Sequence, residues 1–158
     1  MVVVLLVAGC GGAKSAGAQE RSVHGTGYVF SAPTAWQVTR SGREISVSSG
    51  LSVVSVTRFL LQRAFRPALW PKVVRELDRA AAAVAQQQAG TIAESRTVAI
   101  AGGRARQYEV AYAHDGKQLV ERLVFVLREK TEYLLLCRYE RGGDTRACDR
   151  LLATFRLT

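Results

Sequence analysis

The segment QLVERLVFVLREKTEYLLLCRYE, residues 118 to 140, decides the fold of this chain. A polar stretch at residues 128 to 130 divides it into two runs rich in β-branched and aromatic residues, which predict neighbouring strands. Because side chains alternate along a strand, Val124 and Val126 fall on one face of the first run and Phe125 falls on the other. Both faces are therefore apolar, and such strands belong to a sheet that is covered on both sides.

Segments with helical periodicity on either side of this region are the candidates for the covers. Residues 72 to 88 carry apolar side chains at helical spacing, between Pro71, which suits a first helical turn, and Gly90, which suits a helix end. Residues 144 to 157 show the same spacing, and Asp144 can cap their start. We therefore predict an α+β fold in which an antiparallel sheet of about six strands is sandwiched between helices.

Alternating and β-branched stretches supply the other strands. Two short strands are predicted on either side of a turn at Pro33. Longer runs and turn signals, including Asp115-Gly116, predict strands at residues 43–49, 51–61, 91–100 and 104–113.

The first ten residues, MVVVLLVAGC, have the features of a lipoprotein signal peptide. Residues 1 to 9 form an apolar region, and Val7, Ala8 and Gly9 before Cys10 resemble the bacterial lipobox. That resemblance implies that Cys10 carries a diacylglyceryl group and becomes the mature N-terminus, with two acyl chains to hold it in a membrane. No Lys or Arg precedes Cys10, so we expect that the true start codon lies further upstream. The alternative is an N-terminal strand that ends in a Gly-Gly turn.

The segment after Cys10 predicts a tether. Residues 11 to 26 are small and polar, which is typical of a flexible linker. The predicted organisation is thus a signal peptide at 1–9, a lipidated cysteine and tether at 10–26, and a folded domain at 27–158. His24 is interpreted as a solvated linker residue.

The cysteine count agrees with export. Lipidation of Cys10 leaves Cys137 and Cys148, which we expect to form a disulfide outside the cytosol. In the loop-entropy model a ring of this size contributes about 3 kcal/mol. The alternative is a pair of free thiols in a reducing compartment.

The composition indicates one globular domain with a basic surface. The chain has 158 residues, of which 48% are hydrophobic, and no apolar run reaches the roughly 18 residues of a spanning helix. The formal charge of +9 favours anionic partners such as lipid head groups, although a solvated basic surface is the simpler interpretation. Because we expect export, we expect no nucleic-acid partner.

The sequence contains no motif that predicts catalysis. Its two histidines are His24 and His114, and the adjacent His114 and Asp115 are not expected to face one another in a tight turn. The acidic residues show no metal-ligand spacing, so we expect no metal and no cofactor. A possible anionic-ligand face, in a basic pocket between sheet and helix, comprises Arg104, Arg106 and Arg122.

Packing motifs along the chain resemble those of PsbP-like domains. The matching stretches are YVFSAPTAW (28–36), GRARQYEVAY (103–112), LVERLVFVLREKTEYLLLCRY (119–139) and CDRLLATFRL (148–157). The resemblance covers about residues 27 to 157 and implies an α-β-α sandwich. Members of this family include extrinsic photosystem subunits, a Ran-binding protein and small envelope lipoproteins of the LpqN type, so the resemblance implies protein binding without catalysis.

These observations together predict a lipid-anchored protein on the extracytoplasmic face of the cell membrane. We expect a non-catalytic module that binds or scaffolds an unknown envelope protein. The alternative is a binding protein or sensor for a small anionic or lipid ligand.

Overall fold

The computed structural model of the chain describes residues 19–158. The predicted signal peptide at residues 1–9 and the lipidation of Cys10 lie outside the described residues. Neither helix of the described part is both long enough and apolar enough to cross a membrane.

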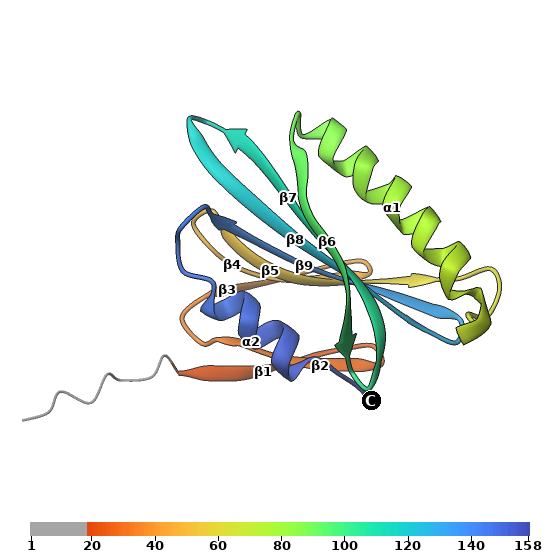
Figure 1. Ribbon diagram of the computed structural model, residues 1–158. Helices are drawn as coiled ribbons and strands as arrows, with labels where there is room; N and C mark the ends of the chain where they lie inside the picture. Colours follow the sequence, from red (N-terminus) through yellow and green to blue (C-terminus); the bar gives the residue numbers. More distant parts are fainter. Residues whose placement is uncertain (1–18) are drawn as a thin grey trace, which may run out of the picture.

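The described chain is mostly β-structure with two α-helices (Figure 1). In chain order the elements are β1 (Glu20–Gly25), β2 (Tyr28–Pro33), β3 (Gln37–Ser41), β4 (Glu44–Ser49), β5 (Ser52–Leu60), the 3₁₀ turn η1 (Pro67–Leu69), α1 (Trp70–Gln87), β6 (Thr91–Ile100), β7 (Gly103–His114), β8 (Lys117–Arg128), β9 (Thr131–Glu140), α2 (Arg146–Thr154) and β10 (Arg156–Leu157).

The main sheet has seven strands in the order β3-β4-β5-β9-β8-β7-β6, and every neighbouring pair is antiparallel. The α+β class is as predicted, but the expected number of about six strands in one sheet is wrong. The strands are also divided between two sheets, because β2 pairs with β1 and β10 in a second sheet of three strands.

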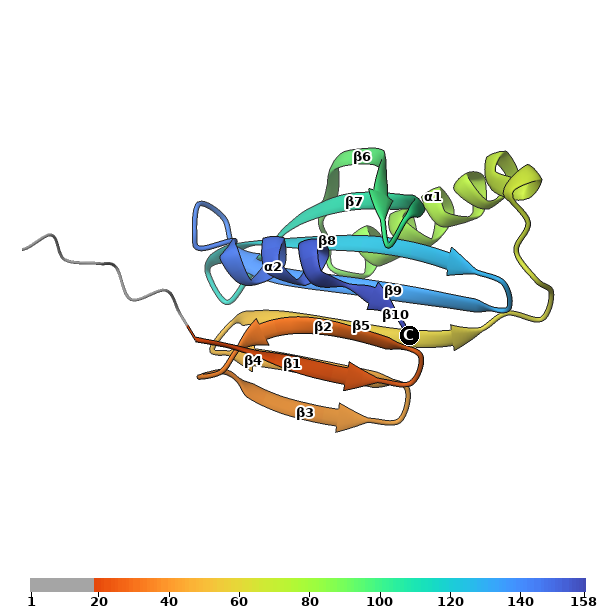
Figure 2. The same cartoon turned by 90° about the horizontal axis from the view of Figure 1, so that it is seen from below.

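The molecule has three layers (Figures 1 and 2). Helix α1 lies over one face of the main sheet, on β6 and β7. Helix α2 and the small sheet lie on the other face, where α2 packs against β2, β5 and β9. The second cover is therefore a helix together with a small sheet, and not a helix alone.

Strands β8 and β9 carry both cores, as the alternation of residues 118 to 140 predicts. Val124 and Val126 belong to the core beneath α2 and the small sheet, and both are almost fully buried. Leu123 and Phe125 belong to the core beneath α1. A continuous apolar run in each strand thus fills two interiors at once.

The predicted tether is wrong at its C-terminal end. Residues 20 to 25 form β1, which pairs with β2 from Glu20 opposite Pro33 to Gly25 opposite Tyr28. An edge strand needs few apolar side chains, and here Val23 alone is buried, with 3% of its surface exposed. The polar composition therefore hid a strand, and His24 is an exposed residue of that strand.

The structure contains the predicted disulfide between Cys137 of β9 and Cys148 of α2. Their Cα atoms lie 5.4 Å apart, and both side chains are buried in the core beneath α2. The bond ties the central strand of the main sheet to the helix that covers it.

Candidate functional site

The predicted face of three arginines is split between the two sides of the main sheet. Arg106 lies opposite Phe125 in the β7–β8 pairing, on the side of α1, and Arg104 shares its parity. Arg122 lies opposite Glu109 in the same pairing, on the side of α2. The three arginines therefore do not share one pocket between sheet and helix, and that expectation is wrong. In the β7–β8 pairing, the side chains of Arg104 and Arg106 lie on one face of the sheet and the side chain of Arg122 lies on the other.

On the side of α1, the guanidinium of Arg106 is neutralised within the fold. It lies 3.1 Å from Asp78 of α1, and its side chain is only 15% exposed. The hydroxyl of Tyr108 also donates to Asp78, over 2.5 Å. Burial, together with the hydrogen bond to Asp78, raises the pKa of Tyr108 to about 12. Arg104 instead stacks over Trp70, 5.3 Å from its ring centroid. Both arginines thus fasten α1 to the sheet.

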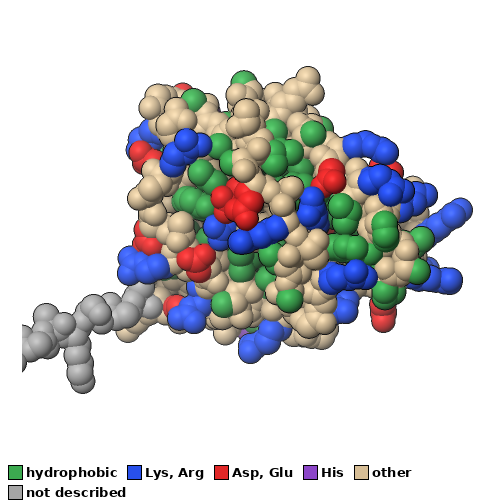
Figure 3. All heavy atoms as spheres, viewed as in Figure 1, with side chains coloured by type: hydrophobic (Ala, Val, Ile, Leu, Met, Phe, Trp, Pro, Cys, Tyr) green, Lys and Arg blue, Asp and Glu red, His purple; other side chains and the backbone are tan. Residues whose placement is uncertain are grey.

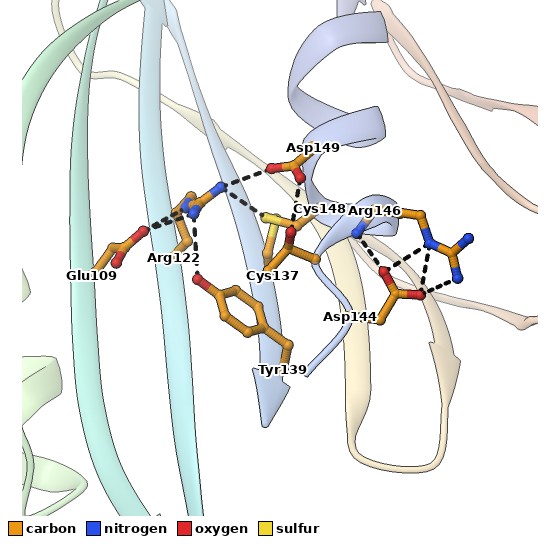
Figure 4. Close-up of a disulfide and its surroundings, with 9 residues drawn as sticks. Glu109, Arg122, Cys137, Tyr139, Asp144, Arg146, Cys148 and Asp149 are labelled. Carbon is orange, nitrogen blue, oxygen red and sulfur yellow. Dashed lines mark hydrogen bonds and ion pairs between the residues drawn. A yellow bond between two sulfur atoms is a disulfide. The ribbon is translucent and has the colours of Figure 1, made fainter. Parts of the chain in front are cut away.

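On the side of α2, Arg122 is enclosed by partners (Figure 4). It lies 2.8 Å from Glu109 and 3.2 Å from Asp149, and it donates to the hydroxyl of Tyr139. Its side chain is 15% exposed and lies beside Cys148 of the disulfide. We call Glu109, Arg122, Tyr139 and Asp149 the Arg122 cluster. Two carboxylates balance the charge of Arg122, and one of them belongs to α2. The cluster therefore has the properties of a structural link between the main sheet and α2.

The buried carboxylate of the fold is also fully engaged. Glu121 of β8 is 5% exposed and accepts hydrogen bonds from Tyr112, over 2.9 Å, and from Gln88, over 2.8 Å. Burial and the hydrogen bond to Glu121 raise the pKa of Tyr112 to about 12. The group joins the end of α1 to the sheet.

The histidine and aspartate at the tip of the β7–β8 hairpin do face one another, contrary to expectation. His114 Nε2 lies 3.4 Å from Asp115 Oδ2, with the side chains 61% and 89% exposed. The hydrogen bonds of residues 19–158 bring no serine, threonine or cysteine to this pair. The same part of the chain contains no group of three or more metal-ligating side chains.

A cavity that the sequence did not predict is lined by residues of the β1–β2 turn and of the β3–β4 hairpin. These two turns lie at the same end of the molecule (Figure 2). The cavity has a volume of about 330 Å³, and Arg58 of β5 lines it as well. Three arginines and one carboxylate line it. We call it the basic pocket; its lining includes His24, Tyr28, Arg40, Arg43, Glu44 and Arg58.

The strand register places two of these arginines, Arg40 and Arg58, on the same side of the sheet. Arg40 of β3 lies opposite Ile45 of β4, which lies opposite Val56 of β5. Ile45 and Val56 are buried between the two sheets. Arg58 follows Val56 by two residues on β5, so its side chain lies on the same face of the strand, beside the pocket. The sequence shows these residues only as ends of separate strands, so the pocket could be found only from their pairing.

The small sheet closes the pocket through Tyr28. Its ring lies where a side chain on Gly25 would stand, since a Cβ there would be 2.1 Å from the ring. The hydroxyl of Tyr28 donates to the carbonyl of Val56, over 3.2 Å, which joins the two sheets beside the pocket. Burial raises the pKa of Tyr28 to about 12.

On one face of the molecule the basic charge is dispersed. On the face shown in Figure 3, lysine and arginine side chains are spread over the surface, and acidic side chains lie among them. This face has the character of a solvated basic surface.

Comparison with known proteins identifies the fold. No protein-family model and no curated protein matches the chain. A solved structure of LpqN from Mycobacterium tuberculosis, described as involved in cell envelope biogenesis, matches 89% of this chain and 91% of its own, at 14% identity and a TM-score of 0.51. The chain shares its fold with LpqN.

A protein from Bacteroides thetaiotaomicron has a similar fold. The match covers 84% of this chain at 10% identity, with a TM-score of 0.61. The chain spans less than half, 45%, of the Bacteroides protein. At these identities the likeness concerns the fold alone.

Proposed function

We propose that the protein is a lipid-anchored, extracytoplasmic module that binds another protein at the cell envelope without catalysing a reaction. Cys10 carries the lipid, and the folded domain, which we assign as PsbP-like, begins at β1. The disulfide is the observation that carries this proposal, because such bonds persist in exported proteins and are rare in the cytosol. The fold shared with LpqN supports a place at the envelope.

The absence of catalysis is part of the proposal. Arg106, Arg122 and Glu121 are held by partners within the fold, and so they are not poised to act on a substrate. His114 and Asp115 lie at an exposed hairpin tip, and they line neither the basic pocket nor the small cavity beside Phe65 and Arg104.

A region of exposed apolar side chains supports protein binding. Phe59 and Leu60 end β5 and are 37% and 61% exposed, and Leu69, after the following loop, is 43% exposed. Exposed apolar side chains around one connection are typical of a protein-contact surface. We propose this apolar end as the contact with the envelope partner, and we propose no nucleic-acid partner.

Metabolic labelling tests the anchor. Cells that make the native protein are given an alkyne fatty acid, and the protein is captured and fractionated. We expect labelled wild type in the membrane fraction and unlabelled Cys10→Ala protein outside it. Unlabelled wild type in the cytosolic fraction would contradict the anchor.

Capture from detergent-solubilised membranes tests the contact surface. A protein that is retained by the wild type should be lost with Leu60→Asp and retained with Ile92→Asp. Ile92 is a suitable control because it is an exposed apolar residue, 38% exposed, on a different strand. Equal capture by both variants would remove the apolar end from the proposal.

A further inference from the structure

We propose that the basic pocket binds a phosphate monoester group through Arg40, Arg43 and Arg58. This inference does not depend on the lipid anchor or on the protein partner. It rests on the charge, the free donors and the size of the pocket.

The charge of the pocket is not balanced within the fold. Arg40, Arg43 and Arg58 make no ion pair with a carboxylate of residues 19–158, whereas Arg106 and Arg122 do. Three guanidinium groups against the one carboxylate of Glu44 leave a net positive charge of two. A phosphate monoester carries a charge of about −1.5 to −2 at neutral pH, which matches this excess.

One of the lining arginines, Arg58, has an N–H that the fold leaves without an acceptor. The Nε of Arg58 is buried and has no hydrogen-bond partner in the described structure. Because this atom is buried, the Arg58 side chain must shift before a ligand oxygen can accept its N–H, and the resulting hydrogen bond would satisfy the donor. Arg40 donates one hydrogen bond to the backbone carbonyl of His24, over 2.9 Å, and this contact orients its guanidinium beside the β1–β2 turn.

Guanidinium groups are well suited to bind a phosphate. Each presents parallel N–H donors that match two oxygens of one phosphate. The three groups come from β3, the β3–β4 turn and β5, so a bound anion would be held by three separate segments. A phosphate monoester has three terminal acceptor oxygens for these donors, whereas a carboxylate has two.

The volume limits what can be attached to the phosphate. About 330 Å³ lies near the lower end of the range of roughly 300–1,000 Å³ for small-molecule sites. It admits a phosphate with a small polar group, such as glycerol, and leaves no room for an acyl chain. The carboxylate of Glu44 is positioned in the lining to accept hydrogen bonds from hydroxyls of that group.

The phosphate can belong to a soluble molecule or to a lipid head group. The pocket lies at the Gly25 end of β1, and residue 19 lies at the other end (Figure 2). The six residues of β1 lie between residue 19 and the pocket, which are therefore about 20 Å apart. A lipid whose head group enters the pocket would keep its acyl chains outside.

Calorimetric titration of the full 158-residue chain with glycerol 3-phosphate tests the soluble source. Co-sedimentation with vesicles of phosphatidylcholine containing phosphatidic acid, against vesicles of phosphatidylcholine alone, tests the lipid source. We expect saturable binding in at least one arm, together with a shift of the Arg58 Nε–Hε resonance in the NMR spectrum. No binding in either arm would overturn the proposal.

Arginine variants locate the site. Arg58→Gln and Arg43→Gln should each weaken binding about tenfold or more, the loss expected for a charge-assisted hydrogen bond. Arg43 lies in an exposed turn, so its variant remains informative if Arg58→Gln fails to fold. Arg141→Gln removes the same charge from an exposed loop outside the pocket and should leave affinity within twofold. Equal weakening by Arg141→Gln and the pocket variants would show non-specific attraction and overturn the assignment.

Discussion

Arg122 shows how a single side chain can join three elements of this fold. From β8 it reaches Glu109 on β7, Tyr139 on β9 and Asp149 on α2 (Figure 4). The same residue looks, in the sequence, like a free cation on a ligand-binding face. Charge partners depend on the strand register, which the sequence of β8 alone does not specify.

Replacement of Arg122 should therefore lower stability and not merely reduce surface charge. Arg122→Gln leaves Glu109, whose side chain is 20% exposed, without its cation, and we expect a loss of about 2 kcal/mol in the free energy of unfolding. Arg104→Gln removes only a stacking contact with Trp70 and should cost about 0.5 kcal/mol. Urea denaturation of the two variants checks this difference. Equal losses would mean that the Arg122 cluster does not stabilise the fold.

The start of α2 should show a specific pH dependence. Hydrogen bonds from the Arg146 side chain and backbone lower the pKa of Asp144 to about 2. A lowered pKa in the folded state means that the contribution of Asp144 is present above the unfolded value of about 3.9 and is lost as the pH falls towards 2. NMR titration of the Asp144 carboxyl carbon should give a midpoint near pH 2. A midpoint near 4 would contradict this contact.

At the scale of elements, the connection between α1 and β6 depends on a close approach of two backbones. A Cβ on Gly90 would lie 2.6 Å from the carbonyl oxygen of Ala111, which cannot move without disturbing β7. Gly90→Ala should therefore lower the free energy of unfolding by about 1–3 kcal/mol. The sequence correctly marks Gly90 as a helix end, but the reason is this contact and not a left-handed conformation.

Gly103→Ala is the matched control for that variant. Its added Cβ would also meet a close neighbour, at 2.9 Å, but this neighbour is not part of the backbone; it is the end of the Arg128 side chain, which donates to the carbonyl of Ala101. The side chain can shift and weaken that one hydrogen bond, so we expect a loss of at most about 1 kcal/mol, measured by the same denaturation. A cost equal to that of Gly90→Ala would contradict the distinction between backbone and side-chain neighbours.

The disulfide between β9 and α2 should contribute measurably to stability. The cysteines are 11 residues apart, and the loop-entropy model gives about 3 kcal/mol for such a ring. The double variant Cys137→Ala, Cys148→Ala should therefore unfold at lower urea concentration than the wild type. Reductant should lower the midpoint of the wild type and leave that of the double variant unchanged. A wild type that is insensitive to reductant would show that the bond is absent in solution.

Elements differed in how far the sequence could specify them. Strands β5, β7, β8 and β9 and both helices follow from periodicity, because each buries at least one apolar face. Strand β6 has no buried residue, and it was predicted from its position before the Gly102-Gly103 turn. Strand β1 was missed because an edge strand of six residues buries a single apolar side chain, Val23. Its pairing is fixed by β2 and not by its own composition.

At the scale of the whole molecule, the layered fold could be predicted and the pocket could not. Apolar residues on both parities of β8 and β9 require two covers, which the structure supplies with α1 and with α2 beside the small sheet. The basic pocket draws on β3, β5 and two turns, and only the assembled sheets bring these together. The fold depends on the pattern of apolar residues within each strand and helix. The basic pocket depends on which strands and turns come together in the folded protein.

The central claim is that the protein is exported and anchored through Cys10, and intact-mass spectrometry of the protein from its native membranes tests it most directly. We predict a chain that begins at Cys10, carries a diacylglyceryl group, and is 2 Da lighter than its reduced form because Cys137 and Cys148 are joined. An unlipidated chain that retains residues 1–9 and has all three thiols free would contradict the account.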